Sequence, residues 1–151
     1  MKQGNLNMWG SKKNKYKGPI TSLIGRGTKI VGDIDFSGGM HVDGEIYGNI
    51  TDSSDSESSI TISEFGHVVG EIHIPNVIIN GEIEGNIYSS NYLELLSKAK
   101  IKGNIYYHTI EMAVGSEVNG SLEHEVVKIE PMSNAKLGQE ESIQQSLTQQ
   151  L

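Results

Sequence analysis

The sequence predicts an all-β, single-domain protein, a parallel β-helix of about six short coils. A unit of glycine, a polar residue and then Ile or Leu recurs eight times in 151 residues, and one glycine per cycle stands at positions 32, 48, 70, 85, 103 and 120. The spacings are 16, 22, 15, 18 and 17 residues. Apolar and polar residues alternate around these glycines, as in Ile72-His73-Ile74, which is the period of a β-strand. Short strands separated by glycine corners are typical of a solenoid.

Other repeat classes do not fit this pattern. Leucine-rich, ankyrin and helical-hairpin repeats need a longer period or a helix in every unit, and no window before residue 136 sustains a helical stripe. In a parallel β-helix, coils stack about 4.8 Å apart. Inward Ile, Val and Leu should then form ladders along the axis, and glycine should allow corner conformations that a Cβ would forbid.

The composition agrees with one domain of tight corners around a narrow aliphatic core, since the chain has 18 glycines, 3 prolines and 2 phenylalanines. It has no cysteine, which excludes disulfides and thiolate metal sites and favours a reducing compartment. No apolar run approaches the length of a membrane span, and the N-terminus lacks the apolar segment of a signal peptide. We therefore expect a cytoplasmic protein.

Residues 1–19 are predicted to be a disordered basic leader, because they are polar and rich in Gly, Asn and Lys. Its one concentrated feature is an apolar and aromatic pair beside a lysine cluster, typical of a peptide that inserts at an anionic bilayer surface. The candidate membrane-binding residues are Met8, Trp9, Lys12, Lys13, Lys15 and Lys17. A merely solvated lysine-rich tail is the alternative interpretation.

The charge of the chain is divided between this leader and an acidic body. Residues 1–32 carry seven basic and no acidic residues, although the whole chain has a net charge of −7. A phosphate-binding surface needs a basic stripe along the fold itself. We therefore expect no nucleic-acid partner.

The repeat region is predicted to span residues 20–125, followed by a disordered, Gln- and Ser-rich tail over 126–151. The 22-residue interval contains a polar run at 51–59, which we interpret as a solvated corner loop. The run contains carboxylates and hydroxyls, but it lacks the glycine and the terminal glutamate of a calcium-binding loop.

Catalysis finds little support in the sequence, and no cofactor or metal site is predicted. The histidines fall at different phases of the repeat with no pair spacing that would fix a metal, so we interpret them as outward-facing. They are His41, His67, His73, His108 and His124. The asparagines of the repeated Gly-Asn-Ile unit, at positions 49, 86 and 104, are interpreted as stacked corner amides.

The ends of the solenoid are the candidate assembly site. A solenoid exposes unpaired backbone and apolar side chains at both ends, and repeat proteins normally cover these with polar caps. No capping helix is evident here. The candidate polymerisation residues are Ile20, Leu23 and Ile24 at one end and Val114, Val118 and Leu122 at the other.

Several segments together make the chain resemble the bactofilins, polymer-forming cytoskeletal proteins of bacteria. These segments are SLIGRG at 22–27, VDGEIYGNI at 42–50, VVGEI at 68–72, VIINGEIEGNI at 77–87, LELL at 93–96 and AKIKGNI at 99–105. The resemblance implies a right-handed β-helix that assembles end to end into non-polar filaments without nucleotide. It also implies a position on the inner face of the cytoplasmic membrane and a role in scaffolding cell-wall enzymes that set cell shape, rather than an enzymatic activity. The sequence departs from the family in its 22-residue coil and at Val118, where the family often has an aromatic residue.

The alternative is a left-handed hexapeptide-repeat acyltransferase, which is also a glycine-rich β-helix and would be an enzyme. Against it, the intervals of 16, 22, 15 and 17 residues are not multiples of six. The usual helical cap and catalytic histidine context of those enzymes are also missing.

Overall fold

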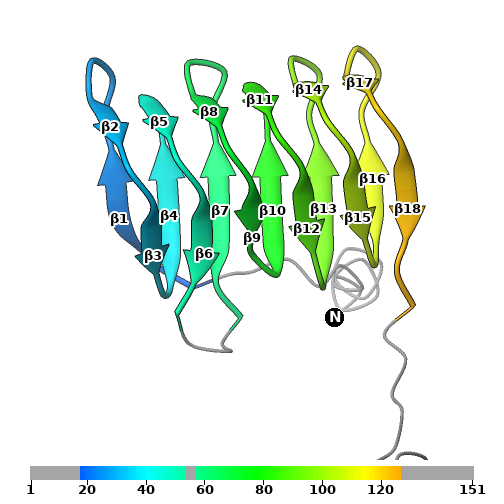
Figure 1. Ribbon diagram of the computed structural model, residues 1–151, viewed down its shortest axis with the longest axis horizontal. Coiled ribbons are helices and arrows are strands. Elements are labelled where there is room, and N and C mark those ends of the chain that lie inside the picture. The colour runs from blue at the N-terminus through cyan, green and yellow to red at the C-terminus, as the bar shows by residue number, and fades with distance from the viewer. Residues whose placement is uncertain (1–17, 54–56, 127–151) are drawn as a thin grey trace, which may run out of the picture.

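The computed structural model describes residues 18–53 and 57–126, so residues 1–17, 54–56 and 127–151 lie outside it. The described residues form eighteen short strands and no helix, and the strands wind into a solenoid of six coils with three strands each (Figure 1). The predicted all-β solenoid of about six coils is confirmed. The described residues contain no helix that is long and apolar enough to cross a membrane.

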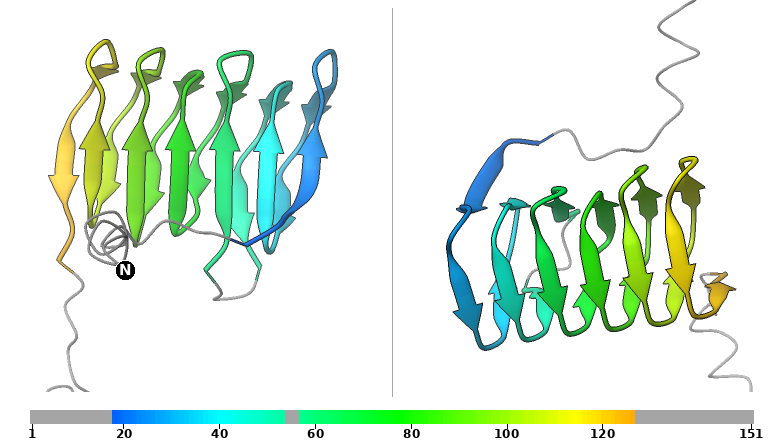
Figure 2. Two further views of the ribbon diagram at one scale, coloured as in Figure 1. Left: turned by 180° about the vertical axis from the view of Figure 1, so that it is seen from behind. Right: turned by 90° about the horizontal axis from the view of Figure 1, so that it is seen from above.

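The strands stack into three parallel sheets of six strands, and each coil gives one strand to each sheet (Figure 2). The first sheet contains β1 (Ile20–Ile24), β4 (Gly39–Val42), β7 (Ser59–Ile62), β10 (Asn76–Ile79), β13 (Tyr92–Leu95) and β16 (Ile110–Met112). The second contains β2 (Lys29–Val31), β5 (Glu45–Tyr47), β8 (His67–Val69), β11 (Glu82–Glu84), β14 (Lys100–Lys102) and β17 (Glu117–Asn119). The third contains β3 (Ile34–Phe36), β6 (Ile50–Asp52), β9 (Ile72–His73), β12 (Ile87–Ser89), β15 (Ile105–Tyr107) and β18 (Leu122–His124).

The core consists of aliphatic rows that run along the axis from coil to coil. In the second sheet the inward row is Ile30, Ile46, Val68, Ile83, Ile101 and Val118. In the third sheet it is Ile34, Ile50, Ile72, Ile87, Ile105 and Leu122. Between the terminal coils both rows are fully buried. Because burying one such side chain contributes about 1.5–3 kcal/mol, these rows are the main source of the stability of the solenoid.

The glycines make the corner between the second and third strands of each coil narrow enough to stack. Gly85 has a φ of +150°, and a Cβ placed on it would lie 2.0 Å from the carbonyl oxygen of Gly70 in the preceding coil. No side chain fits at that distance. The repeat therefore needs glycine at this corner both for its backbone conformation and for the close approach of neighbouring coils.

The corner asparagines lie at equivalent positions of the coils, and their side-chain oxygens accept hydrogen bonds from backbone N–H groups. The backbone N–H of Glu71 donates to Asn49 Oδ1 at 2.9 Å, and that of Asn104 donates to Asn86 Oδ1 at 2.9 Å. The backbone N–H of Ser121 donates to Asn104 Oδ1 at 3.1 Å. Each side chain thus satisfies a backbone donor of the next coil, so these asparagines have a structural role.

The polar run at 51–59 differs from the predicted loop at both of its ends. Thr51 belongs to β6, where it pairs with Asp35 on one side and His73 on the other. Ser59 begins β7, pairs with Gly39 and Asn76, and is buried. The parallel ladder therefore extends into the polar run from both sides, because backbone pairing in the stacked coils does not depend on the side chain. The corner itself is shorter than predicted.

Candidate functional site

The two ends of the solenoid differ from the rest because their coils have a neighbour on one side only. β1, β2 and β3 form the edge of the three sheets at the N-terminal end, and β16, β17 and β18 form it at the C-terminal end. Within the described residues no further strand or helix covers either edge. Each edge therefore presents unpaired backbone groups and the last members of the inward rows.

At the N-terminal end, the predicted residues of β1 fall in different rows. Ile24 pairs with Val42 and lies in an inward row, and it packs against the core. Leu23 pairs with His41, is largely exposed and faces outward. Ile20 lies beyond an irregularity in the register and is exposed as well. Only Ile24 of the three thus continues the core to the edge.

At the C-terminal end, the predicted residues have similarly different positions. Val118 is partly buried and ends the inward row of the second sheet, next to Ile101. Leu122 ends the row of the third sheet and remains 43% exposed. Val114 is 96% exposed in the turn between β16 and β17. Val118 and Leu122 therefore form the open end of the core, whereas Val114 lies at its rim.

Sequence reasoning missed two further apolar residues at the ends. Met112 is 46% exposed and ends an inward row of the first sheet, where it pairs with Leu95. Aligning Ile110-Glu111-Met112 with Leu93-Glu94-Leu95 would have identified it. Val31 is 78% exposed on the outward face of β2, where the next coil has Tyr47.

The two end coils also differ in charge. The first coil, residues 20–36, carries two basic residues, Arg26 and Lys29, and two acidic residues, Asp33 and Asp35, which cancel. The last coil, residues 110–125, carries four glutamates and neither lysine nor arginine. The C-terminal end is therefore acidic and the N-terminal end is neutral.

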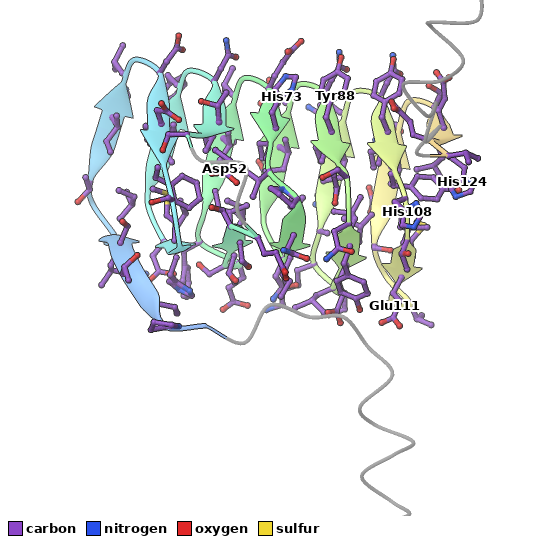
Figure 3. The ribbon with its side chains drawn as sticks, turned by 90° about the horizontal axis from the view of Figure 1, so that it is seen from below. Asp52, His73, Tyr88, His108, Glu111 and His124 are labelled. Carbon is purple, nitrogen blue, oxygen red and sulfur yellow. The ribbon has the colours of Figure 1, made fainter. Side chains whose placement is uncertain are left out.

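On the outward faces of the sheets, in contrast, side chains contact side chains of other coils. His67 contacts Glu84 at 3.1 Å, and Lys98 contacts Glu64 at 2.5 Å. In the third sheet His73 and Tyr88 stack with ring centres 4.2 Å apart (Figure 3). The ring of Tyr106 stacks on that of Tyr88, with centres 4.7 Å apart. Such contacts between exposed groups are individually weak.

Two of the titratable groups with shifted pKa values, Asp43 and Tyr92, also make contacts between neighbouring coils. A hydrogen bond from Ser63 lowers the pKa of the Asp43 carboxyl, with His41 adding to the effect. Burial raises the pKa of the Tyr92 hydroxyl, and its 2.7 Å hydrogen bond to Glu111 acts in the same direction. Both shifts have a structural cause in contacts between neighbouring strands.

The remaining predicted site residues lie outside the described part of the chain. These are Met8, Trp9, Lys12, Lys13, Lys15 and Lys17. Among residues 18–53 and 57–126, no three His, Cys, Asp or Glu side chains are grouped so that they could hold a metal ion. The two open ends are thus the structural feature of the described chain that most directly suggests a function.

Comparisons with known proteins agree with this picture. The profile of the bactofilin family, described as polymer-forming cytoskeletal, matches residues 22–123. Bactofilin BacO from Myxococcus xanthus (strain DK1622) is 28% identical over 102 residues, which cover 68% of this chain and 78% of that protein. No solved structure is significantly similar to the chain. The family profile covers the whole solenoid from its first strand to its last, and this chain therefore belongs to the bactofilin family of polymer-forming cytoskeletal proteins.

Proposed function

We propose that this protein is a structural scaffold whose solenoids join end to end, without nucleotide, into non-polar filaments. The observation that carries the proposal is the pair of sheet edges that no other described residue covers, at which rows of core side chains end with one neighbouring coil instead of two. Membership of a polymer-forming family supports the self-assembly. The resemblance to bactofilins described above supports the non-polar arrangement and the absence of a nucleotide.

The physical reason for assembly is that a second copy supplies what each edge lacks. Val118, Leu122 and Met112 would gain apolar neighbours, and the edge strands would lose their exposure to water. If like ends meet, the filament alternates between two different contacts and has no direction. The N-terminal contact would then centre on Ile24 and its exposed neighbours, and the C-terminal contact on Val118.

The test is assembly of the purified full-length chain in buffer that contains no nucleotide. We expect filaments in negative-stain micrographs and protein in the pellet after ultracentrifugation, with no change when ATP or GTP is added. A discrete trimer that turns over acyl-CoA would contradict the proposal and favour a hexapeptide-repeat acyltransferase.

We further propose that the filament lies on the inner face of the cytoplasmic membrane and is held there by the leader. The composition of the leader supports this, because Trp9 stands beside Lys12, Lys13, Lys15 and Lys17. Each lysine near an anionic leaflet contributes about 1 kcal/mol, so one leader would attach only weakly and reversibly. A filament presents many leaders on one rod, and their combined attachment is far stronger.

Co-sedimentation with anionic liposomes tests this attachment. We expect the wild type to bind, and we expect deletion of residues 1–17 to abolish binding while filaments persist. Trp9→Ala combined with serine at the four lysines should have the same effect. Binding by the leader-deleted filament would place the contact elsewhere.

The proposed role at the membrane is to position proteins that modify the cell wall and set cell shape. The resemblance to bactofilins supports these partners, and the protein itself is proposed to have no enzymatic activity and no cofactor. Crosslinking in cells, compared between the wild type and an assembly-deficient variant, tests this role. Capture of the same wall enzymes by both proteins would contradict a scaffold that works as a polymer.

A further inference from the structure

The five histidines of the chain fall into two groups. Three of them contact a carboxylate within about one coil, and each contact lies on an outward face of the solenoid. They are His41 with Asp43 at 2.9 Å, His67 with Glu84 at 3.1 Å and His73 with Glu71 at 3.0 Å. The other two, His108 and His124, have no carboxylate contact with any of the described residues.

The fold brings these two remaining histidines together at the C-terminal edge. His108 directly follows β15, and His124 ends β18, the last strand of the third sheet. Because Tyr107 pairs with His124, the ring of His108 lies beside that of His124, with ring centres 6.0 Å apart (Figure 3). Both side chains are exposed. Sequence spacing alone does not reveal the pair, since its members are sixteen positions apart.

The backbone holds both histidines in place. The N–H of His108 donates to the carbonyl oxygen of Ser89 at 3.2 Å, and the N–H of Glu125, next to His124, donates to the carbonyl oxygen of Tyr107 at 2.7 Å. The ring of Tyr107 lies 5.5 Å from that of His124. The two imidazoles therefore project from anchored positions on adjacent strands, and only their side-chain torsions need to adjust to a ligand.

We propose that His108 and His124 form a two-histidine site for a first-row transition-metal ion, with Zn²⁺ as its simplest occupant. Imidazole is the commonest protein ligand of such ions. The ring planes are inclined by only 28°, so the side-chain torsions must turn until one nitrogen of each ring points toward the ion. Ring centres about 6 Å apart are compatible with an ion that then lies about 2.1 Å from each of these nitrogens. In the unassembled chain water fills the remaining positions, because the described residues offer no third histidine or carboxylate grouped with the pair.

The surroundings of the pair favour a cation. The last coil carries only acidic charges, and Glu123 and Glu125 flank His124 in the sequence. Their field raises the local concentration of divalent cations without supplying a ligand. A paired histidine such as His67 lacks this advantage, because a bound ion there would have to displace the contact with Glu84.

Isothermal titration of the full-length chain with Zn²⁺ tests the proposal. We expect one ion per chain, at least about tenfold weaker binding in His108→Gln and in His124→Gln, and no measurable binding in the double variant. His67→Gln is the matched control and should bind as the wild type does. All five histidines lie in the described residues and the chain has no cysteine, so residues outside the described ranges supply no imidazole or thiolate ligand.

A second measurement identifies the ligands directly. Electron paramagnetic resonance of one equivalent of Cu²⁺ should show coupling to two imidazole nitrogens in the wild type and in His67→Gln, and to fewer in either single variant of the pair. Unchanged Zn²⁺ affinity in the double variant, or lost affinity in His67→Gln, would overturn the site. Circular dichroism and pelleting without metal report folding and assembly separately, so a failure to form filaments does not affect the result.

Discussion

Ile83 and Val118 occupy the same place in the repeat, the middle of a strand in the second sheet, but they lie in very different environments. Ile83 lies between Val68 and Ile101 and is fully buried. Val118 pairs with Ile101 on one side, no strand of the described residues lies on the other, and it is only partly buried. In a solenoid the number of adjacent coils thus determines how deeply an inward residue is buried. The same pattern stabilises the fold in the interior and is available for assembly at an end.

The largest expected difference in stability is between an interior residue and an exposed end residue. Ile83→Ala leaves a cavity in a row closed on both sides, so we expect it to lower the free energy of unfolding by about 2–5 kcal/mol. Val31→Ala, at an exposed position of the first coil, should change it by less than about 0.5 kcal/mol. Urea unfolding followed by circular dichroism measures both. Equal losses would contradict the distinction between interior and end.

A smaller effect on stability is expected from the hydrogen bonds of the corner asparagines. Asn104→Ala removes the acceptor for the backbone N–H of Ser121, and we expect a loss of about 1 kcal/mol. Asn104→Asp keeps an acceptor oxygen at that place and is the matched control. If both variants lose the same free energy of unfolding in the same urea assay, the hydrogen bond is not the cause.

The smallest effect on stability is expected at an outward-facing contact between two coils. His67 and Glu84 are in contact at 3.1 Å but partly exposed to water, and exposed pairs contribute little. His67→Gln should therefore change the free energy of unfolding by less than about 0.5 kcal/mol. A loss of unfolding free energy comparable with that of Ile83→Ala would show that outward-facing contacts, and not the inward rows, hold the coils together.

The sequence was sufficient to predict the features that the repeat imposes on every coil. Alternation around glycine predicted the inward rows, and the spacing of the glycines predicted six coils. The corner asparagines were also predictable, because Asn86 and Asn104 each stand between a glycine and an isoleucine in successive units. These features follow from local sequence, since each coil repeats the same backbone conformation.

Features that depend on which residues face each other across coils were harder to predict. Leu23 was grouped with Ile24 because both are apolar, although the register places them on opposite faces of β1. His108 and His124 meet only because the intervening corners make Tyr107 pair with His124. Corner lengths vary from coil to coil, and the period of the glycines does not specify them.

The most direct test of the account compares two neighbouring residues of the last coil. Val118→Arg adds a charge at the open end of the core, and Asn119→Arg adds the same charge one residue later, on the outward side of β17. We expect both proteins to keep the circular dichroism of a folded β-protein. The Val118→Arg protein should fail to grow beyond a monomer or dimer in sedimentation velocity, because the end contact is lost, whereas Asn119→Arg should still form filaments. Filaments of normal length from the Val118→Arg protein would contradict the claim that the open ends of the solenoid carry the assembly.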